Sequence, residues 1–271
     1  MGEATLEMVL IGNGDKVTSG AGRGAIGEVR EIAVRHRFGG EPGLFWLGGF
    51  RSNMEGSKAN AVDQYAARRG LACTRFDYSG HGCSGGRFED GTISRWLDEA
   101  EAVFRRFAQG PQVVVGSSMG GWIALLLAER LAGSGQLAGL VLLAPAIDMT
   151  RKLIWDEMDA AARREMETAG LFLVPSDYSD EPYPITRGLV EDGDAHLLGD
   201  RLIETGCPVH ILQGTEDTDV PWTTATDLIA HLASDDAVLT LVKGADHRLS
   251  RPEDLARLEA AIDGLIAEMP G

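Results

Sequence analysis

The chain of 271 residues is long enough for one large α/β domain and short for two independent ones. Its composition, 44% hydrophobic and 24% charged residues, is that of an ordinary globular protein rather than a disordered or fibrous one. The 41 acidic and 25 basic residues give a net charge of −16, which argues against nucleic acid or an anionic membrane surface as the main partner.

The cysteine count and the apolar runs bear on the compartment. Cys73, Cys83 and Cys207 are sparse and odd in number, which favours free thiols in a reducing environment. No apolar run approaches the length of about 18 residues that a membrane span needs. The first residues also lack the basic and apolar segments of a signal peptide. We therefore expect a cytoplasmic protein without a membrane span; the sequence does not indicate its oligomeric state.

The first part of the chain predicts antiparallel strands. Residues 6–11 are apolar, and residues 32–38 alternate with the period of two that a half-buried strand shows. A turn at residues 39–43 leads into a short apolar strand at 44–47. The glycine-rich segment 12–27 matches no element and no family pattern.

From residue 58 onward, predicted helices alternate with predicted strands. The helices are expected at 58–69, 92–109, 119–131 and about 250–266, and the strands at 71–76, 112–116, 140–143, 209–212 and 238–242. This alternation is typical of parallel βαβ units, with helices on both faces of a twisted sheet.

One stretch interrupts the alternation. Residues 147–205 contain two helix-like pieces, 148–169 and 186–198, around a proline-rich joint, and no clear buried strand. We expect a single domain over residues 1–271, with a small helical cap inserted over one end of the sheet after its sixth strand.

The central motif is Gly-x-Ser-x-Gly at Gly116–Gly120, between an apolar strand and a helix. In this context the serine lies on a strained strand-to-helix turn, and the residues two positions away must be small. The turn projects Ser118 above the sheet and directs the N–H of Met119 at a developing oxyanion. Ser117 is the rival hydroxyl, but the glycine spacing favours Ser118 as the nucleophile.

A serine hydroxyl needs a general base, and in folds with this motif the chain order is Ser, then Asp or Glu, then His. His247 follows the last predicted strand, at the sheet edge where functional groups collect. The acid that orients it should come from the loop after strand 209–212. Asp217 is the first choice there, and Glu216 and Asp219 remain alternatives.

A second oxyanion donor is expected from the loop after the third strand. In Trp46–Phe50 the glycines allow the backbone to approach a substrate, and the N–H of Phe50 is the candidate donor. Residues that could line the substrate site are Gly49, His81, Trp122, Met149, Ile154 and Trp155.

Three sets of residues together carry a family resemblance: Gly116–Trp122, Gln213–Pro221 with Asp217, and Asp246–Arg248. They resemble the α/β-hydrolase superfamily, and with Arg75–Gly82 they look like one branch of it. That branch includes bacterial serine hydrolases and a mitochondrial thioesterase that acts on palmitoyl-proteins and acyl glucuronides. The likeness covers the chain from about residue 32 to its end.

The resemblance implies hydrolysis of esters or thioesters. It assigns Ser118, Asp217 and His247 as the triad, and Phe50 and Met119 as the oxyanion amides. The sequence departs from the superfamily at Gly48, where many members have a histidine. Its acidic N-terminus is also unlike an import sequence, so the mitochondrial location of the relative does not carry over.

Cofactor and metal sites are not expected. Gly22–Gly27 matches Gly-x-Gly-x-x-Gly, but a predicted strand follows it where a dinucleotide site needs a helix. No paired histidine or cysteine spacing indicates a metal.

The sequence thus predicts an α/β-hydrolase that cleaves a small-molecule ester or thioester, or an acylated protein, through an acyl-enzyme. A serine peptidase on the same triad is an alternative, in which Glu89 or Asp90 could hold an amino terminus. A non-hydrolytic receptor that retains the site is another.

Overall fold

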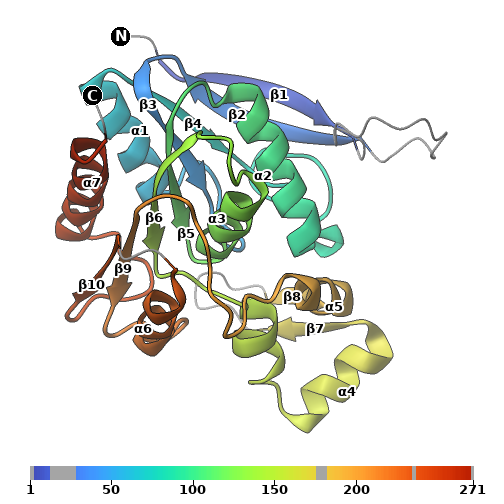
Figure 1. The fold of residues 1–271 in the computed structure, drawn as a ribbon. Coiled ribbons are helices and arrows are strands. Elements are labelled where there is room, and N and C mark those ends of the chain that lie inside the picture. The colour runs from blue at the N-terminus through green and yellow to red at the C-terminus, as the bar shows by residue number, and fades with distance from the viewer. Residues whose placement is uncertain (1–2, 13–28, 175–181, 234–235, 270–271) are drawn as a thin grey trace.

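The structure, a computed structural model, describes residues 3–12, 29–174, 182–233 and 236–269 (Figure 1). The Gly22–Gly27 motif and nearly all of the glycine-rich segment lie outside the described residues.

The chain order of the elements follows the predicted alternation. The strands are β1 (Thr5–Ile11), β2 (Arg30–Arg37), β3 (Gly40–Leu47), β4 (Leu71–Phe76), β5 (Gln112–Ser117), β6 (Leu137–Leu143), β7 (Leu171–Val174), β8 (Tyr183–Thr186), β9 (Val209–Gly214) and β10 (Ala237–Val242). The α-helices are α1 (Ser57–Arg69), α2 (Ile93–Phe107), α3 (Met119–Arg130), α4 (Ala160–Ala169), α5 (Arg187–Gly193), α6 (Trp222–His231) and α7 (Pro252–Ala267).

Eight strands form one sheet in the order β1-β2-β4-β3-β5-β6-β9-β10. The pairs β1–β2 and β2–β4 are antiparallel, and every other neighbouring pair is parallel. The register pairs Leu47 with Gly116, so the loops that leave β3 and β5 begin side by side. The mostly parallel sheet with antiparallel N-terminal strands confirms the predicted fold class.

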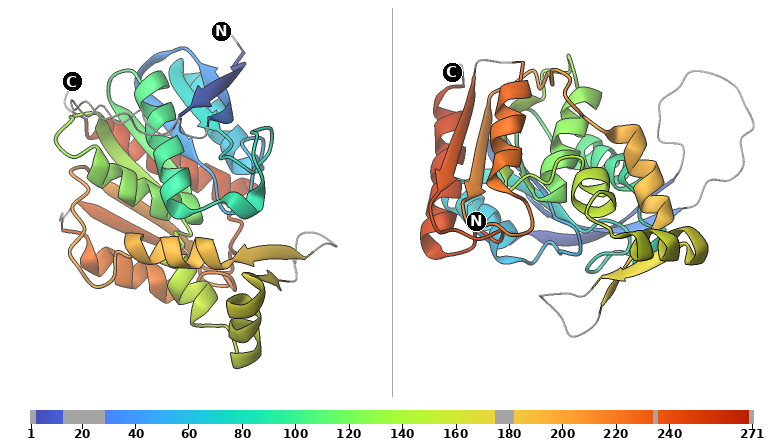
Figure 2. Two further views of the ribbon diagram at one scale, coloured as in Figure 1. Left: turned by 90° about the vertical axis from the view of Figure 1, so that its right-hand side faces the viewer. Right: turned by 90° about the horizontal axis from the view of Figure 1, so that it is seen from below.

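Helices cover both faces of the sheet (Figures 1 and 2). Apolar side chains of α2, α3 and α6 pack on one face, and those of α1 and α7 on the other. Helix α2 buries the stripe from Ile93 to Phe107 and begins after Thr92, whose hydroxyl accepts a hydrogen bond from the Arg95 N–H (3.1 Å). Helix α1 ends at Gly70, which adopts the left-handed conformation (φ 69°).

The inserted cap lies over one end of the sheet, as Figure 2 shows, and is more varied than expected. The predicted helix 148–169 is two pieces, a π-helical turn (Thr150–Trp155) and α4, because Asp159 caps a new helix through hydrogen bonds from Ala161 and Ala162. Strands β7 and β8 pair as a hairpin that the sequence did not predict. Within the two strands, Leu171–Val174 and Tyr183–Thr186, only Ile185 is buried, so their pattern lacks the apolar run of a core strand.

Within the described part of the chain, no helix is long and apolar enough to span a bilayer.

A buried ion pair connects β2 to α2. The guanidinium of Arg30 lies 3.2 Å from the carboxylate of Glu99, and both side chains are almost fully buried. Glu99 also accepts a hydrogen bond from the Ser79 N–H (2.9 Å), which fixes the start of the loop after β4. Burial raises the pKa of Glu99, while the Ser79 hydrogen bonds and Arg30 oppose that rise.

Replacing Arg30 by Met should therefore lower the free energy of unfolding by about 3 kcal/mol, because a buried carboxylate loses its cation. Urea denaturation measures the change. The control is Arg35→Met on the same strand, which removes an exposed ion pair with Glu55 and should cost less than about 1 kcal/mol. Equal losses in the two variants would show that Arg30 does not stabilise the Glu99 carboxylate.

Candidate active site

Ser118 occupies a sharp turn between β5 and α3. Its backbone is left-handed (φ 55°, ψ −120°), a strained conformation for a residue with a side chain. A Cβ at Gly116 would overlap the carbonyl oxygen of Gly120, and a Cβ at Gly120 would overlap that of Leu47. The two glycines of the motif are therefore required by backbone packing. Ser117 is 4% exposed and lies in the sheet, whereas Ser118 is partly exposed above it.

A chain of hydrogen bonds connects Ser118, His247 and Asp217. His247 Nε2 lies 3.1 Å from Ser118 Oγ, and His247 Nδ1 lies 2.8 Å from Asp217 Oδ2. The carboxylate accepts from Nδ1–H, which leaves Nε2 as the acceptor for the serine proton. Three side chains that are far apart in sequence thus have the geometry of a nucleophile, a general base and an orienting acid.

Asp217 is held by its own loop. Its Oδ1 accepts from the N–H groups of Asp219 (3.0 Å) and Val220 (2.8 Å), and its Oδ2 accepts from Gln213 Nε2 (2.9 Å). Burial raises the pKa of Asp217. The hydrogen bond and charge of His247, with the hydrogen bonds from Val220 and Gln213, outweigh burial and hold the pKa below its ordinary value. The carboxylate therefore stays ionised beside His247.

Close backbone packing brings Asp217 and His247 together. The loop after β9 contacts the loop after β10, where the Glu216 N–H donates to the carbonyl of Ala245 (3.0 Å). A Cβ at Gly214 would overlap that same carbonyl oxygen, so only glycine permits this approach. The alternative acids, Glu216 and Asp219, have exposed side chains.

The loop after β3 passes directly over Ser118. A Cβ at Gly49 would lie 3.3 Å from the Cβ of Ser118, so this backbone is in contact with the serine. Phe50 follows, and its N–H makes no hydrogen bond to any described residue. Met119 is the first residue of α3, where a backbone N–H has no acceptor within the helix. Both amides are therefore free for an anionic oxygen.

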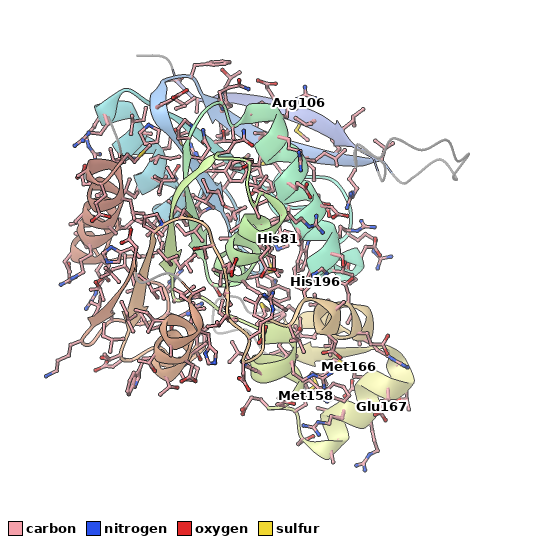
Figure 3. The ribbon with its side chains drawn as sticks, in the orientation of Figure 1. His81, Arg106, Met158, Met166, Glu167 and His196 are labelled. Atoms are coloured by element: carbon pink, nitrogen blue, oxygen red, sulfur yellow. The ribbon has the colours of Figure 1, made fainter. Side chains whose placement is uncertain are left out.

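The other residues expected to line the site fall into three groups. Trp122 and Met149 are buried in the core, and the Trp122 indole donates to the His196 carbonyl (3.3 Å). Ile154 and Trp155, like Phe50 and Met158, pack against an apolar cluster of the cap that contains Met166; Met158 and Met166 are labelled in Figure 3. His81 lies on the body of the protein and lines an open pocket of about 430 Å³ with Arg51, Phe88, Glu89 and Tyr183. Ser118 is not part of that lining.

Two side chains that hold the loops carrying Asp217 and His247 were not identified from the sequence. Gln213 donates to Asp217, and Lys58 at the start of α1 donates to the carbonyl of Arg248 (2.6 Å), next to His247. Burial lowers the pKa of Lys58 to about 8. A lysine in the first turn of a helix is ordinarily solvated, so nothing in the local sequence indicates this contact.

Among the described residues, no three His, Cys, Asp or Glu side chains gather in a way that could hold a metal ion.

Comparisons with known proteins identify the family of the chain. The family model described as "Serine aminopeptidase, S33" matches residues 52–187. The human protein named "Palmitoyl-protein thioesterase ABHD10, mitochondrial" is 32% identical over 243 residues, which cover 89% of this chain and 78% of that protein.

Two solved structures share most of the chain. A protein from Agrobacterium vitis named "Putative hydrolase" superposes with a TM-score of 0.87 at 47% identity, covering 97% of this chain and 99% of that one. Mouse α/β-hydrolase domain-containing protein 10 superposes with a TM-score of 0.83 at 28% identity, covering 97% of this chain and 100% of that one. The chain therefore belongs to the serine aminopeptidase S33 family of α/β-hydrolases, and it is a hydrolase.

Proposed function

We propose that the protein is a serine hydrolase that cleaves carboxylic esters or thioesters through an acyl-enzyme intermediate. The observation that carries the proposal is the hydrogen-bonded series Ser118–His247–Asp217, with contacts of 3.1 and 2.8 Å, on a strained strand-to-helix turn. A hydroxyl in this arrangement can lose its proton to the imidazole as it attacks.

In the acylation step, Ser118 Oγ attacks the carbonyl carbon while His247 Nε2 takes the hydroxyl proton. The carbonyl oxygen becomes an oxyanion that accepts hydrogen bonds from the N–H groups of Met119 and Phe50, each worth about 3 kcal/mol in comparable sites. The tetrahedral intermediate collapses and expels the alcohol or thiol, which takes its proton from His247. Asp217 stays ionised and holds the imidazole tautomer.

In the deacylation step, water replaces the leaving group. His247 removes a proton from the water as its oxygen attacks the acyl carbon, and then returns the proton to Ser118 Oγ as the ester bond breaks. The products are a carboxylic acid and the free enzyme, so the cycle needs no cofactor.

The choice of esters and thioesters rests on two supports. One is the activity for which the human relative is named, that of a palmitoyl-protein thioesterase whose sequence aligns with most of this chain. The other is the apolar cap cluster of Met166, Ile185 and Val190, against which Ile154, Trp155, Met158 and Phe50 all pack. We propose that these side chains receive the acyl group, so that the substrate is a small-molecule ester or thioester or an acylated protein.

A peptidase is the second candidate. The family description names an aminopeptidase, and Glu89 lines the open pocket near Phe50, where a carboxylate could bind an amino terminus. Glu89 already lies 3.6 Å from the Arg87 guanidinium, which weakens this use of it. Hydrolysis of esters is therefore favoured.

The expected compartment is the cytoplasm, a proposal that rests on three sparse cysteines. The curated relatives are named as mitochondrial proteins.

Replacing Ser118 by Ala should abolish turnover of a short-chain p-nitrophenyl ester and labelling by a fluorophosphonate probe, because the attacking oxygen is lost. Release of p-nitrophenol and in-gel fluorescence measure the two effects. Ser117→Ala is the matched control and should keep both. Turnover that persists in Ser118→Ala would refute the proposal, and a wild-type protein inert to both reagents would favour a non-hydrolytic receptor.

Replacing Asp217 by Asn should lower kcat by about 10⁴-fold, because the amide no longer fixes the tautomer of His247.

The Asp217→Asn substitution should also change the pH dependence of the free energy of unfolding. Since folding lowers the pKa of Asp217, its contribution is complete above its unfolded value near 3.8 and disappears as the pH falls through the lower folded value. Chemical unfolding should therefore show a gap between wild type and Asp217→Asn that closes below about pH 4. A gap that is independent of pH would contradict the lowered pKa.

Activity on p-nitrophenyl esters should rise from acetyl to octanoyl chains, because longer chains can bury methylene groups in the cap cluster at about 0.8 kcal/mol each. Steady-state kcat/KM across the series measures this preference, and matched p-nitroanilides measure amide cleavage. A monotonic fall with chain length would refute the acyl role of the cap. Faster cleavage of the anilides would favour the peptidase.

A further inference from the structure

The loop between β3 and α1, residues 48–56, is held by hydrogen bonds to side chains at the end of β4 and in the segment just after it. This loop carries Gly49, which packs on Ser118, and Phe50, whose N–H is one of the proposed oxyanion donors. Its own turn includes a hydrogen bond from the Ser52 N–H to the Gly49 carbonyl (3.1 Å). The same hydrogen bond occurs in turns whose central peptides are oriented differently. Contacts from other parts of the chain therefore decide the orientation in this turn.

One of those outside contacts comes from His81. Its Nε2 lies 3.1 Å from the Arg51 N and accepts that backbone N–H, while its Nδ1 lies 3.2 Å from the Ser79 carbonyl oxygen. Nδ1 therefore carries the hydrogen and donates it, so both ring nitrogens are engaged. The Ser79 carbonyl also accepts from the Trp96 indole (3.2 Å), and the ring of His81 packs edge-on against Trp96 and Phe88.

The peptide that His81 holds is strained. Arg51 has a φ of 55°, a left-handed conformation that costs a residue with a side chain about 1–2 kcal/mol. The guanidinium of Arg51 stacks on the ring of Tyr183 (4.6 Å) from the cap. The Phe50–Arg51 peptide shares the Cα of Phe50 with the Gly49–Phe50 peptide, which carries the Phe50 N–H. A relaxation of Arg51 that displaced Phe50 would therefore also shift the proposed oxyanion donor.

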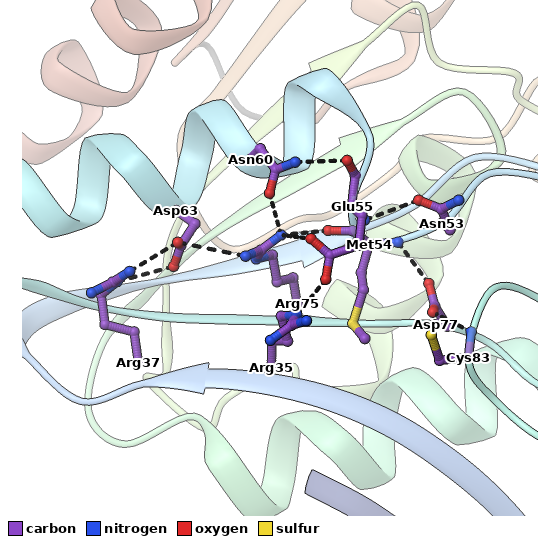
Figure 4. Close-up of polar contacts among 10 residues, drawn as sticks. All are labelled: Arg35, Arg37, Asn53, Met54, Glu55, Asn60, Asp63, Arg75, Asp77 and Cys83. Atoms are coloured by element: carbon purple, nitrogen blue, oxygen red, sulfur yellow. Dashed lines mark hydrogen bonds and ion pairs between the residues drawn. The ribbon is translucent and has the colours of Figure 1, made fainter. Parts of the chain in front are cut away.

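The rest of the loop is held independently, as Figure 4 shows. Asp77 Oδ1 accepts from the Met54 N–H (2.6 Å), and its Oδ2 accepts from the Cys83 N–H (2.8 Å). Arg75 donates to the Met54 carbonyl (2.6 Å) and to Asn60 Oδ1 (2.6 Å). Loss of the His81 contact should therefore free the Phe50–Arg51 peptide without releasing the loop as a whole.

We propose that His81 is a positioning residue for the hydrolytic reaction: by accepting the Arg51 N–H it holds the Phe50 amide in the orientation that stabilises the oxyanion. The inference rests on the proposed function and adds a residue to its machinery.

Two other uses of His81 fit the structure less well. A polar contact to substrate would need a free ring nitrogen, and both are engaged. A role as general base would need a pKa near neutrality, whereas burial, against the Ser79 hydrogen bond, lowers the pKa of His81 to about 4. The neutral ring is the form that the Arg51 contact requires, because an imidazolium has no acceptor.

The test compares three substitutions of His81 by steady-state kinetics with a p-nitrophenyl ester. His81→Phe keeps the aromatic packing and removes the acceptor, so kcat should fall by about 10- to 100-fold with little change in KM. His81→Gln places an amide oxygen near the position of Nε2 and should restore most of kcat. His81→Asn is too short to reach Arg51 and should behave like Phe, which keeps the test decisive if the Phe variant does not fold.

Inhibition by an alkylboronic acid is the second readout. Its tetrahedral adduct with Ser118 places an oxygen in the oxyanion site, so His81→Phe should weaken inhibition by the same factor as it lowers kcat/KM. The matched control is His36→Phe, a buried histidine on β2 that contacts Thr74 Oγ1 (2.9 Å) and no residue of the loop. It should leave both kcat and inhibition unchanged.

Equal kinetics for His81→Phe and wild type would overturn the inference, as would a rise in KM alone or a failure of Gln to rescue. These results are distinct from failure of the proposed function, which Ser118→Ala decides. If Ser118→Ala is inactive and His81→Phe is not impaired, only the positioning role is wrong.

Discussion

The site depends on one close backbone contact, between the first turn of α3 and the end of β3. Gly120 lies so near the carbonyl oxygens of Leu47 and Gly48 that no side chain fits there. This contact permits the sharp turn in which Ser118 adopts a φ of 55°. It also brings the loop after β3 into contact with the serine. The positions of the proposed nucleophile and of its proposed oxyanion donors therefore depend on the same backbone contact.

Buried carboxylates hold the loops around this contact. Asp217 accepts backbone N–H groups beside His247, Asp77 accepts those of Met54 and Cys83, and Glu99 accepts that of Ser79. Asp148 does the same at the base of the cap, where it binds the N–H groups of Leu198 and Gly199. Each carboxylate replaces the solvation it loses by binding amides that would otherwise be unpaired, so each loop gains a fixed conformation. Several acidic residues of this negatively charged chain therefore have an internal structural role.

The fold class was predictable because its signals are local and periodic. The stripe on α2, the apolar run of β5 and the glycine that ends α1 each follow from a few neighbouring residues. The cap was less predictable. The strands β7 and β8 bury only Ile185, and the start of α4 depends on a single capping residue, Asp159. Short elements with one buried side chain carry too little periodicity to be recognised.

The sequence by itself determined that Ser118 lies on a strand-to-helix turn and that His247 follows the last strand. The tight turn requires glycines two positions away from the serine, and the order of the segments along the chain is read directly from the sequence. Only the tertiary structure decided which carboxyl meets His247 and that His81 binds a backbone amide of the β3 loop. Those contacts join segments that are 30 residues apart in each case. Their partners are chosen by the approach of separate strands and loops, which no local pattern encodes.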